Sequence, residues 1–306
     1  MWNPLAVVTS EKDFSKPLIG NRLANAAGLH VARIMAADGF DRMRWAMWKP
    51  TAENKPWIDT LRRDGVVAVP NFLPQDQFEK VREEGVSALR NSLTAIPPRD
   101  NRLPGFGAKE PFKDGTGFDR FDGGTLNRFL FVSPQRTPVT LSTIHAPRFR
   151  NFYAAAQGRD FPDSAITLYY MRHGPQDVHD DQKDFHRDTF HFTIKFWYFL
   201  EDAGPETGPF IYVKGSNRSD SKRLKWEYDR SLKASRGIRS EGGAFRATEQ
   251  ELKDLGLPEP TVMTAKANTM VIADTHGFHR RGDAVEGAER LSIYGGMRRS
   301  PYWFGS

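Results

Sequence analysis

One short stretch of the chain carries two residues that could bind a metal ion together. His186 and Asp188 are separated by a single residue, and residues i and i+2 of a strand point to the same face. The pair could therefore bind one cation. If a strand runs unbroken from the pair to Phe196, both ligands face the apolar interior, while Thr193 and Lys195 face away. The spacing then predicts a metal ion in a dry pocket.

A third ligand follows a second strand pattern. The apolar run 269–274 leads into His276 and His279, and either imidazole could complete the site. Two histidines and one carboxylate on one face of a metal leave coordination positions free, as in non-haem Fe(II) oxygenases. Open positions indicate a catalytic metal.

A candidate carboxylate anchor begins the next strand. Arg290 and Ser292 lie on one face of that strand, 11 residues after His279. A planar guanidinium pairs bidentately with a carboxylate, and a neighbouring hydroxyl adds a third hydrogen bond. This pair suits a small diacid. An earlier alternating strand supplies three candidate contacts for a substrate: Tyr169, Tyr170 and Arg172. Core packing is the alternative explanation for the two tyrosines.

Composition excludes several classes of site and protein. The chain has no cysteine, which excludes disulfides, thiolate metal sites, iron–sulfur clusters and a cysteine nucleophile. With 39% hydrophobic and 12% aromatic residues, it can form a sizeable core. No apolar run approaches the roughly 18 residues of a membrane span. The first four residues do not begin a secretory signal, so we expect a cytoplasmic location.

The net charge of +6 is concentrated in one stretch. Residues 214–239 contain nine basic and three acidic residues, an excess equal to the net charge of the whole chain. One interpretation is a solvated helical insertion over 214–257. The other is a surface that attracts phosphates, carboxylates or anionic lipid. We expect no nucleic acid as a partner, because no helix-turn-helix, RNA-binding signature or basic tail accompanies the stretch.

The N-terminal part is predicted to be helical. Residues 18–48 predict an amphipathic helix with these apolar positions on one face: Leu23, Ala27, Val31, Ile34 and Met35. Packing on the core is the first interpretation. A membrane-surface or partner-binding helix is the alternative, which Trp45 and Trp48 favour. A helix that Gly65 ends, a buried strand over 66–69 and a helix over 74–89 follow.

The rest of the chain predicts an α+β protein with a mainly β core. Residues 96–124 are read as a long loop. Short β-branched or aromatic runs predict six later strands: 165–172, 189–200, 209–213, 261–264, 269–274 and 290–297. We predict one domain over 1–306, in which a helical part (1–95) packs on a β core (160–300).

These motifs resemble those of the phytanoyl-CoA dioxygenase family of Fe(II)/2-oxoglutarate-dependent oxygenases over residues 160–297. The resemblance rests on four motifs in the same order: His186-Arg187-Asp188, Gly208-Pro209-Phe210 with Gly215-Ser216, His279, and Arg290-x-Ser292. Lys214 and Asn217 depart from the family pattern, which commonly has proline and histidine there. The departure affects a local turn and none of the candidate ligands.

The resemblance implies a double-stranded β-helix (a cupin-like jelly roll) with flanking N-terminal helices and iron at one mouth. It favours His279 over His276 as the third ligand beside His186 and Asp188. It also implies that 2-oxoglutarate chelates Fe(II) and extends its far carboxylate to Arg290 and Ser292, while O2 takes the last site. The implied reaction is hydroxylation of an unactivated C–H bond.

The substrate expectation rests on a narrower resemblance. Residues 20–33 and 267–279 are similar to bacterial members that hydroxylate 3-deoxy-octulosonate in lipopolysaccharide precursors. With the basic stretch, this implies a small-molecule or lipid-linked anionic substrate, such as that sugar acid. It also implies peripheral contact with the anionic inner face of a membrane.

Other interpretations of the same residues are weaker. A second His-x-Asp pair, His179 and Asp181, lies in a polar stretch with no strand after it. His191 has the opposite parity and is expected to be structural. The triplet at 186–188 also occurs in kinase catalytic loops, but Thr193 stands where such a loop needs asparagine. A noncatalytic or 2-oxoglutarate-independent metal-binding jelly roll of the cupin type is the alternative function.

Overall fold

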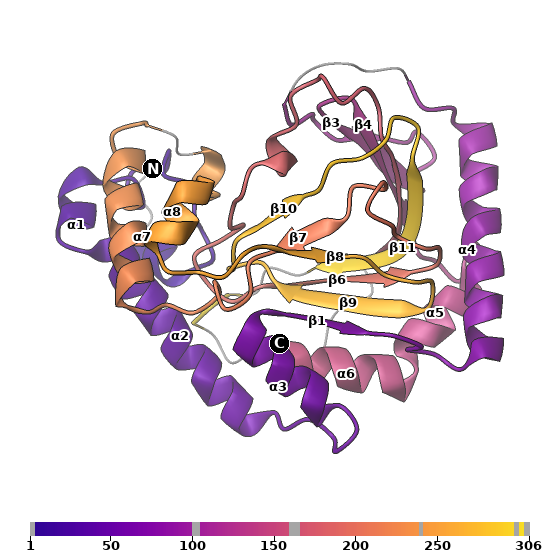
Figure 1. The fold of residues 1–306 in the computed structure, drawn as a ribbon, viewed down its shortest axis with the longest axis horizontal. Helices are drawn as coiled ribbons and strands as arrows, with labels where there is room; N and C mark the ends of the chain where they lie inside the picture. Colours follow the sequence, from indigo (N-terminus) through magenta and orange to yellow (C-terminus); the bar gives the residue numbers. More distant parts are fainter. Residues whose placement is uncertain (1–3, 100–104, 159–165, 239–240, 297–299, 303–306) are drawn as a thin grey trace.

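Two antiparallel β-sheets lie at the centre of the molecule (Figure 1). The computed structural model describes residues 4–99, 105–158, 166–238, 241–296 and 300–302. The larger sheet has the strand order β1-β9-β6-β11-β5-β4-β3-β2, and the smaller has the order β10-β7-β8. The strands are β1 (Val66–Val69), β2 (Glu110–Pro111), β3 (Gly117–Asp122), β4 (Thr125–Phe131), β5 (Ile166–Arg172), β6 (Ile194–Phe199), β7 (Phe210–Tyr212), β8 (Thr261–Met263), β9 (Thr269–Asp274), β10 (His279–Arg281) and β11 (Glu289–Gly296).

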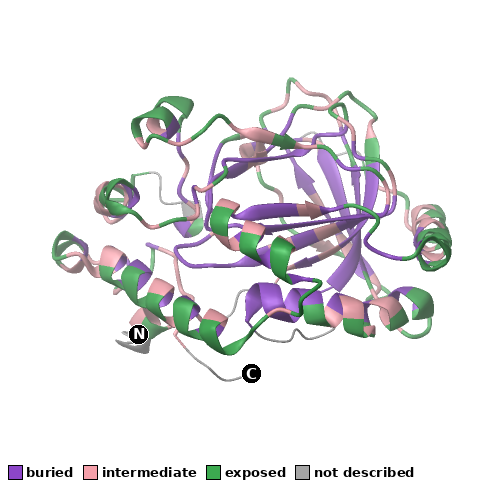
Figure 2. Ribbon diagram, turned by 60° about the horizontal axis from the view of Figure 1, so that its bottom comes forward, coloured by how far each residue is buried: buried purple, intermediate pink, exposed green. Residues whose placement is uncertain are grey.

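Helices flank these sheets, and the outer side of most of them is exposed to solvent (Figure 2). They are α1 (Arg22–Ala26), α2 (Leu29–Met47), α3 (Lys55–Asp64), α4 (Gln75–Ala95), α5 (Pro138–His145), α6 (Pro147–Gln157), α7 (Ser221–Ala234) and α8 (Glu249–Asp254). Each helix of the described residues is too short or too polar to span a membrane.

Strand alternation divides the larger sheet into two faces with different roles. On β6, Phe196 and Tyr198 belong to the main apolar core, which α3, α4, α5 and α6 complete. The alternate residues Lys195 and Trp197 line a pocket on the opposite face. The helices therefore seal one face of the sheet, and the smaller sheet lies over the other face (Figure 1).

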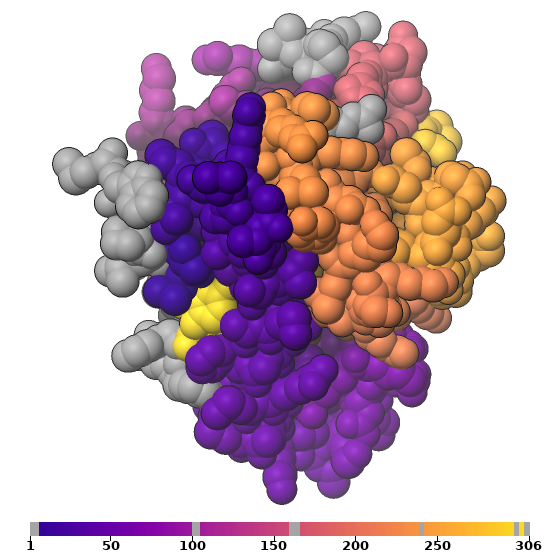
Figure 3. Space-filling view, turned by 90° about the vertical axis from the view of Figure 1, so that its left-hand side faces the viewer, coloured from indigo at the N-terminus to yellow at the C-terminus, as the bar shows by residue number. Residues whose placement is uncertain are grey.

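A second apolar cluster lies at the N-terminal end of the molecule. It joins the N-terminal segment, the α7–α8 insertion and the loop before β6 through residues such as Phe14, Trp226, Phe245 and Phe185. Figure 3 shows the N-terminal segment in indigo against the insertion in orange. The basic stretch is thus part of a packed lobe.

The predicted α+β fold with a mainly antiparallel β core and N-terminal helices is confirmed, and all six predicted later strands are present. The larger sheet extends beyond the predicted 160–300 core, because β1, β3 and β4 join it. The prediction of a loop over 96–124 is wrong for β3. Its inward positions include Asp119, whose buried ion pair with Arg128 gives the strand a polar sequence.

The amphipathic helix is present, but most of the predicted buried face is wrong. Gly28 (φ 92°) divides it into α1 and α2. Ile34 is buried, whereas Leu23 and Met35 are 83% and 59% exposed. The helix packs partly through charged side chains: the buried Arg33 guanidinium donates to backbone carbonyls of the N-terminal segment and lies over the Phe190 ring. Apolar periodicity alone does not reveal such a face.

Candidate metal centre

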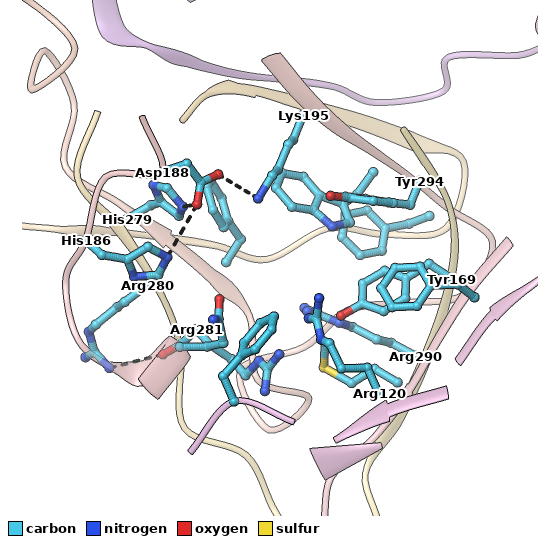
Figure 4. Close-up of a pocket in the computed structure, with 17 residues that line it drawn as sticks. Arg120, Tyr169, His186, Asp188, Lys195, His279, Arg280, Arg281, Arg290 and Tyr294 are labelled. Atoms are coloured by element: carbon cyan, nitrogen blue, oxygen red, sulfur yellow. Dashed lines mark hydrogen bonds and ion pairs between the residues drawn. The ribbon is translucent and has the colours of Figure 1, made fainter. Parts of the chain in front are cut away.

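A pocket lies between the two sheets, and its lining combines aromatic and charged side chains (Figure 4). The aromatic part includes Phe129, Tyr169, Trp197, Phe199, Phe210 and Tyr294. The charged part comprises Asp188 and five cations, Arg120, Lys195, Arg280, Arg281 and Arg290, and the imidazoles of His186 and His279 lie beside Asp188. An apolar wall next to a cationic one suits an anionic ligand with a nonpolar portion.

Three side chains converge at one end of this pocket. Asp188 Oδ1 lies 3.9 Å from Nε2 of both His186 and His279. Reciprocal backbone hydrogen bonds of 3.0 and 2.9 Å join the two histidines, so their segments are held side by side. The ligand atoms of all three residues lie within 4.8 Å of one another, close enough to share one ion.

Hydrogen bonds orient both imidazoles for metal binding. His186 Nδ1 lies 2.7 Å from the carbonyl oxygen of Asp184, and His279 Nδ1 lies 2.9 Å from that of Gly277. Because a carbonyl only accepts, each Nδ1 carries the proton and each Nε2 presents its lone pair to the pocket. Burial, with the neighbouring His279, lowers the pKa of His186 to about 3, and burial also lowers the pKa of His279. Neutral imidazoles and an ionised carboxylate fit a divalent cation such as Fe(II).

The second oxygen of Asp188 is held by a lysine. Lys195 Nζ lies 2.6 Å from Asp188 Oδ2, while Oδ1 faces the imidazoles. Burial alone would raise the pKa of Asp188, but Lys195 and the two histidines lower it well below its usual range. The two carboxylate oxygens therefore have different partners, which favours monodentate binding of a metal.

The prediction that Lys195 faces away from the ligands is wrong. It assumed one unbroken strand from Asp188, but β6 begins only at Ile194, and irregular backbone precedes it. This irregular segment shifts the alternation by one residue. Lys195 consequently lies on the pocket face, and Phe196 packs in the core.

Arg290 lies on the same pocket, away from the three converging side chains (Figure 4). It is 7% exposed, and its Nη1 donates to the carbonyl oxygen of Gly208 at 2.8 Å. Burial, with a contribution from Arg281, lowers its pKa to about 10, so it is still protonated at neutral pH. Within the described part of the chain, no carboxylate pairs with it. A buried cation without a counter-ion favours an anionic ligand.

Ser292 follows Arg290 on the same face of β11 but is not among the pocket-lining residues. It is buried, and its hydroxyl lies 3.5 Å from the carbonyl oxygen of Tyr169 on β5. The structure therefore places the predicted pair together on one strand, with Arg290 in direct contact with the pocket and Ser292 behind its wall.

Only one of the three candidate substrate contacts lines the pocket. Tyr169 does so, and its hydroxyl lies 2.5 Å from Asn127 Oδ1. The expectation for Tyr170 and Arg172 is corrected: Tyr170 packs in the main core with its hydroxyl on Glu289, and Arg172 is exposed. Alternation along β5 puts both on the face opposite to Tyr169.

The competing histidines lie elsewhere. His276 is buried outside the converging group, with Nδ1 2.9 Å from the carbonyl oxygen of Thr189. His191 is also buried, and its Nδ1 lies 3.0 Å from the carbonyl oxygen of Phe192. The upstream pair, His179 and Asp181, lies 2.8 Å apart, and its histidine side chain is 62% exposed. The structure brings His279, rather than these residues, to His186 and Asp188.

Sequence reasoning missed a buried ion network beside Arg290. Arg281 pairs with Asp180 at 2.7 Å and with Asp122 at 3.0 Å, and Arg120 also pairs with Asp122. Arg281 lies two residues after His279 on β10, a spacing that indicates the same face. Asp122 was hidden because it ends β3, within the stretch read as a loop.

Comparison with known proteins identifies the family. A search of curated proteins gives no match. Solved structures similar to this chain include AviO1 from Streptomyces viridochromogenes Tue57 (15% identity, 81% of this chain, 96% of that chain, TM-score 0.47). HygX from Streptomyces hygroscopicus with nickel and 2-oxoglutarate bound is 16% identical (81% and 87% coverage, TM-score 0.42). The family model described as phytanoyl-CoA dioxygenase (PhyH) matches residues 61–263, more than half of the chain. The chain therefore belongs to the phytanoyl-CoA dioxygenase family of Fe(II)/2-oxoglutarate-dependent oxygenases.

Proposed function

We propose that this enzyme hydroxylates an unactivated C–H bond of an anionic substrate, and that His186, Asp188 and His279 hold its iron. The observation that carries the proposal is the convergence of their three ligand atoms, with both imidazole Nδ1 atoms engaged by backbone carbonyls. Fe(II) bound there would couple oxidation of the substrate by O2 to the conversion of 2-oxoglutarate into succinate and CO2.

The protein side chains have separate tasks in this proposal. Arg290 binds the far carboxylate of 2-oxoglutarate through the N–H groups that do not contact Gly208, and Ser292 supports that end of the site. Lys195 keeps Asp188 Oδ2 away from the ion. The aromatic wall limits water beside the reacting C–H bond.

The charge of the pocket supports an anionic substrate. Its five lining cations face one lining carboxylate, Asp188, and two nearby buried carboxylates, Asp122 and Asp180. The five cations therefore exceed the three carboxylates by two, and a divalent metal ion would raise this excess to four, of which the dianion 2-oxoglutarate offsets only half. We infer a sugar acid, free or lipid-linked, as the substrate class, with 3-deoxy-octulosonate of lipopolysaccharide as the specific candidate. Tyr169 is the proposed substrate contact on β5.

The test begins with apo protein under anaerobic conditions. Adding Fe(II) and 2-oxoglutarate should produce a weak visible absorption band, and admitting O2 with ascorbate should produce succinate. Adding 3-deoxy-octulosonate should raise succinate formation and yield a product 16 Da heavier. An absorption band without this stimulation would retain the enzyme class and reject the substrate.

Replacing Lys195 with methionine should weaken 2-oxoglutarate binding about tenfold, the lower end of effects seen when a group supporting a metal ligand is removed. Without the ammonium group, Asp188 Oδ2 is free to approach the ion and compete for the position that the co-substrate needs. The KM for 2-oxoglutarate in the succinate assay measures this effect. Lys266→Met is the matched control, because Lys266 forms an exposed 2.6 Å pair with Asp202. Equal KM values in all three proteins would remove the assigned role of Lys195.

We also propose peripheral contact between the basic stretch and an anionic membrane surface. Several of its cations already have acidic partners, such as Arg223 with Glu227 and Arg230 with Glu251, so the contact depends on the remaining ones. The protein should co-sediment with vesicles that contain anionic lipid at low salt and be released at high salt, because screening weakens exposed charges. Absence of pelleting at low salt would contradict the proposal.

A further inference from the structure

A buried cluster of charges lies behind the metal centre, on the side away from the pocket. Glu227 on α7 is fully buried, and both of its oxygens have cationic or imidazole partners. Arg187 donates to Oε1 at 2.9 Å and to Oε2 at 2.7 Å, while Arg223 Nη2 lies 3.0 Å from Oε1. His30 Nε2 on α2 lies 2.9 Å from Oε2.

The arrangement costs desolvation energy, so its stabilising value is not self-evident. Buried ion clusters are weak evidence for stability and are better attested as devices that specify one geometry. Burial alone would raise the pKa of Glu227, but Arg187, His30 and Arg223 lower it well below its usual range. The carboxylate therefore remains ionised and can hold two guanidinium groups in fixed positions.

The first of these groups belongs to the residue between two candidate metal ligands. Arg187 stands between His186 and Asp188 in the chain. Its side chain points away from the side chains of these two residues, into the second apolar cluster. Besides Glu227, its Nη1 donates to the carbonyl oxygen of Gly243 at 2.6 Å, and its guanidinium lies over the Phe245 ring. Each nitrogen of the guanidinium has a hydrogen-bond partner, and the Arg187 backbone N–H donates to the carbonyl oxygen of Phe245 at 3.0 Å, so both the side chain and the backbone between the two ligands are restrained.

The second guanidinium reaches the segment of the third ligand. Arg223 Nη2 donates to the carbonyl oxygen of His276 at 3.0 Å, and the guanidinium lies over the Phe278 ring. The next carbonyl along the chain, that of Gly277, accepts from His279 Nδ1. One carboxylate thus connects the backbone around His186 with the backbone before His279.

We propose that Glu227 is a positioning residue of the metal centre, which sets the separation of its two ligand-bearing segments through Arg187 and Arg223. This inference rests on the proposed metal site. It also assigns a second role to the basic stretch, because Arg223 of this stretch points inward and donates to the backbone before His279. A purely structural cluster would affect unfolding and leave the affinity of the folded protein for a metal unchanged.

The test compares metal binding with stability in Glu227→Gln. Co(II) titrations of the apo protein report affinity and, through the d–d absorption spectrum, ligand geometry. We expect Glu227→Gln to bind Co(II) about 10–100-fold more weakly with an altered spectrum, the range for lost outer-shell partners. Asp229→Asn, on the same helix in an exposed 2.8 Å pair with Lys225, should match the wild type.

Two further variants separate geometry from stability. Arg187→Lys keeps the charge but loses the bidentate fork, so it should also weaken Co(II) binding, and it decides the question if Glu227→Gln does not fold. Leu252→Ala removes a buried side chain of the second apolar cluster, so it should lower the melting temperature without changing the affinity for Co(II). Unchanged affinity and spectrum in folded Glu227→Gln and Arg187→Lys would overturn this inference and leave the proposed metal site in place. Absence of Co(II) binding by the wild type would overturn the proposed metal site and this inference with it.

Discussion

Replacing His186 with alanine should lower succinate formation from 2-oxoglutarate by more than about 100-fold, because even changes outside the ligand sphere cost about 10–100-fold. The variant removes one of the two nitrogen atoms that converge on Asp188 Oδ1. It leaves the backbone contacts of the segment in place, so the protein should still fold. The assay contains Fe(II), ascorbate, 2-oxoglutarate and O2, and circular dichroism monitors the fold.

The upstream His-x-Asp pair provides the matched control. Together with Asp184, the pair His179 and Asp181 forms a second group of converging ligand atoms, but the His179 side chain is 62% exposed. His179→Ala should therefore retain wild-type turnover and Co(II) affinity. Equal turnover in His186→Ala and wild type would reject the ligand assignment. If only His179→Ala lost turnover, the metal centre would lie instead at the group formed by His179, Asp181 and Asp184.

Replacing Arg290 with alanine should raise the KM for 2-oxoglutarate about 100-fold while leaving Co(II) binding nearly unchanged. The guanidinium is buried without a described carboxylate partner, so a bound diacid would supply its counter-ion. Charge-assisted hydrogen bonds contribute roughly 1.5–3 kcal/mol, and about 2.7 kcal/mol corresponds to 100-fold in affinity. Succinate formation at increasing 2-oxoglutarate concentrations measures the change.

The same experiment tests the alternative function. Arg172→Ala, an exposed change on the neighbouring strand β5, controls for a general effect of removing an arginine and should leave KM unchanged. A metal-binding protein of the cupin type that uses no 2-oxoglutarate would not need Arg290. If Arg290→Ala has the KM of the wild type, the assigned anchor is wrong, whereas the alternative gains support if the wild type itself forms no succinate from 2-oxoglutarate.

Local sequence patterns were sufficient for most of the strands. The runs that became β5, β9 and β11 combine β-branched or aromatic residues with clear boundaries, and their positions agree with the prediction within a few residues. The polar strand β3 was missed because Asp119 and Asp122, which form buried ion pairs, lie on either side of the core residue Phe121 and interrupt the apolar pattern. The buried face of α2 was missed for the same reason, since it packs through Arg33, Asp41 and Arg44.

Side-chain parity had a similar limit at the candidate site. Alternation correctly puts Arg290 and Ser292 on one face of β11, because the strand is regular there. It failed between Asp188 and Lys195, where irregular backbone shifts the register and brings the lysine to the carboxylate. It also could not select Tyr169 over Tyr170, because the sequence does not state which face of β5 meets the pocket.

The sequence by itself determined the kind of chemistry: ligand types without cysteine, their order along the chain, and a cationic anchor at a set distance after the last histidine. These features are local, because residue identity and short spacing carry them. Only the tertiary structure decided that His279 joins His186 and Asp188, that Lys195 holds the second carboxylate oxygen, and that Glu227 connects both ligand-bearing segments. Such contacts join residues far apart in the chain, and packing of the two sheets and the α7 lobe sets them, which no local periodicity encodes.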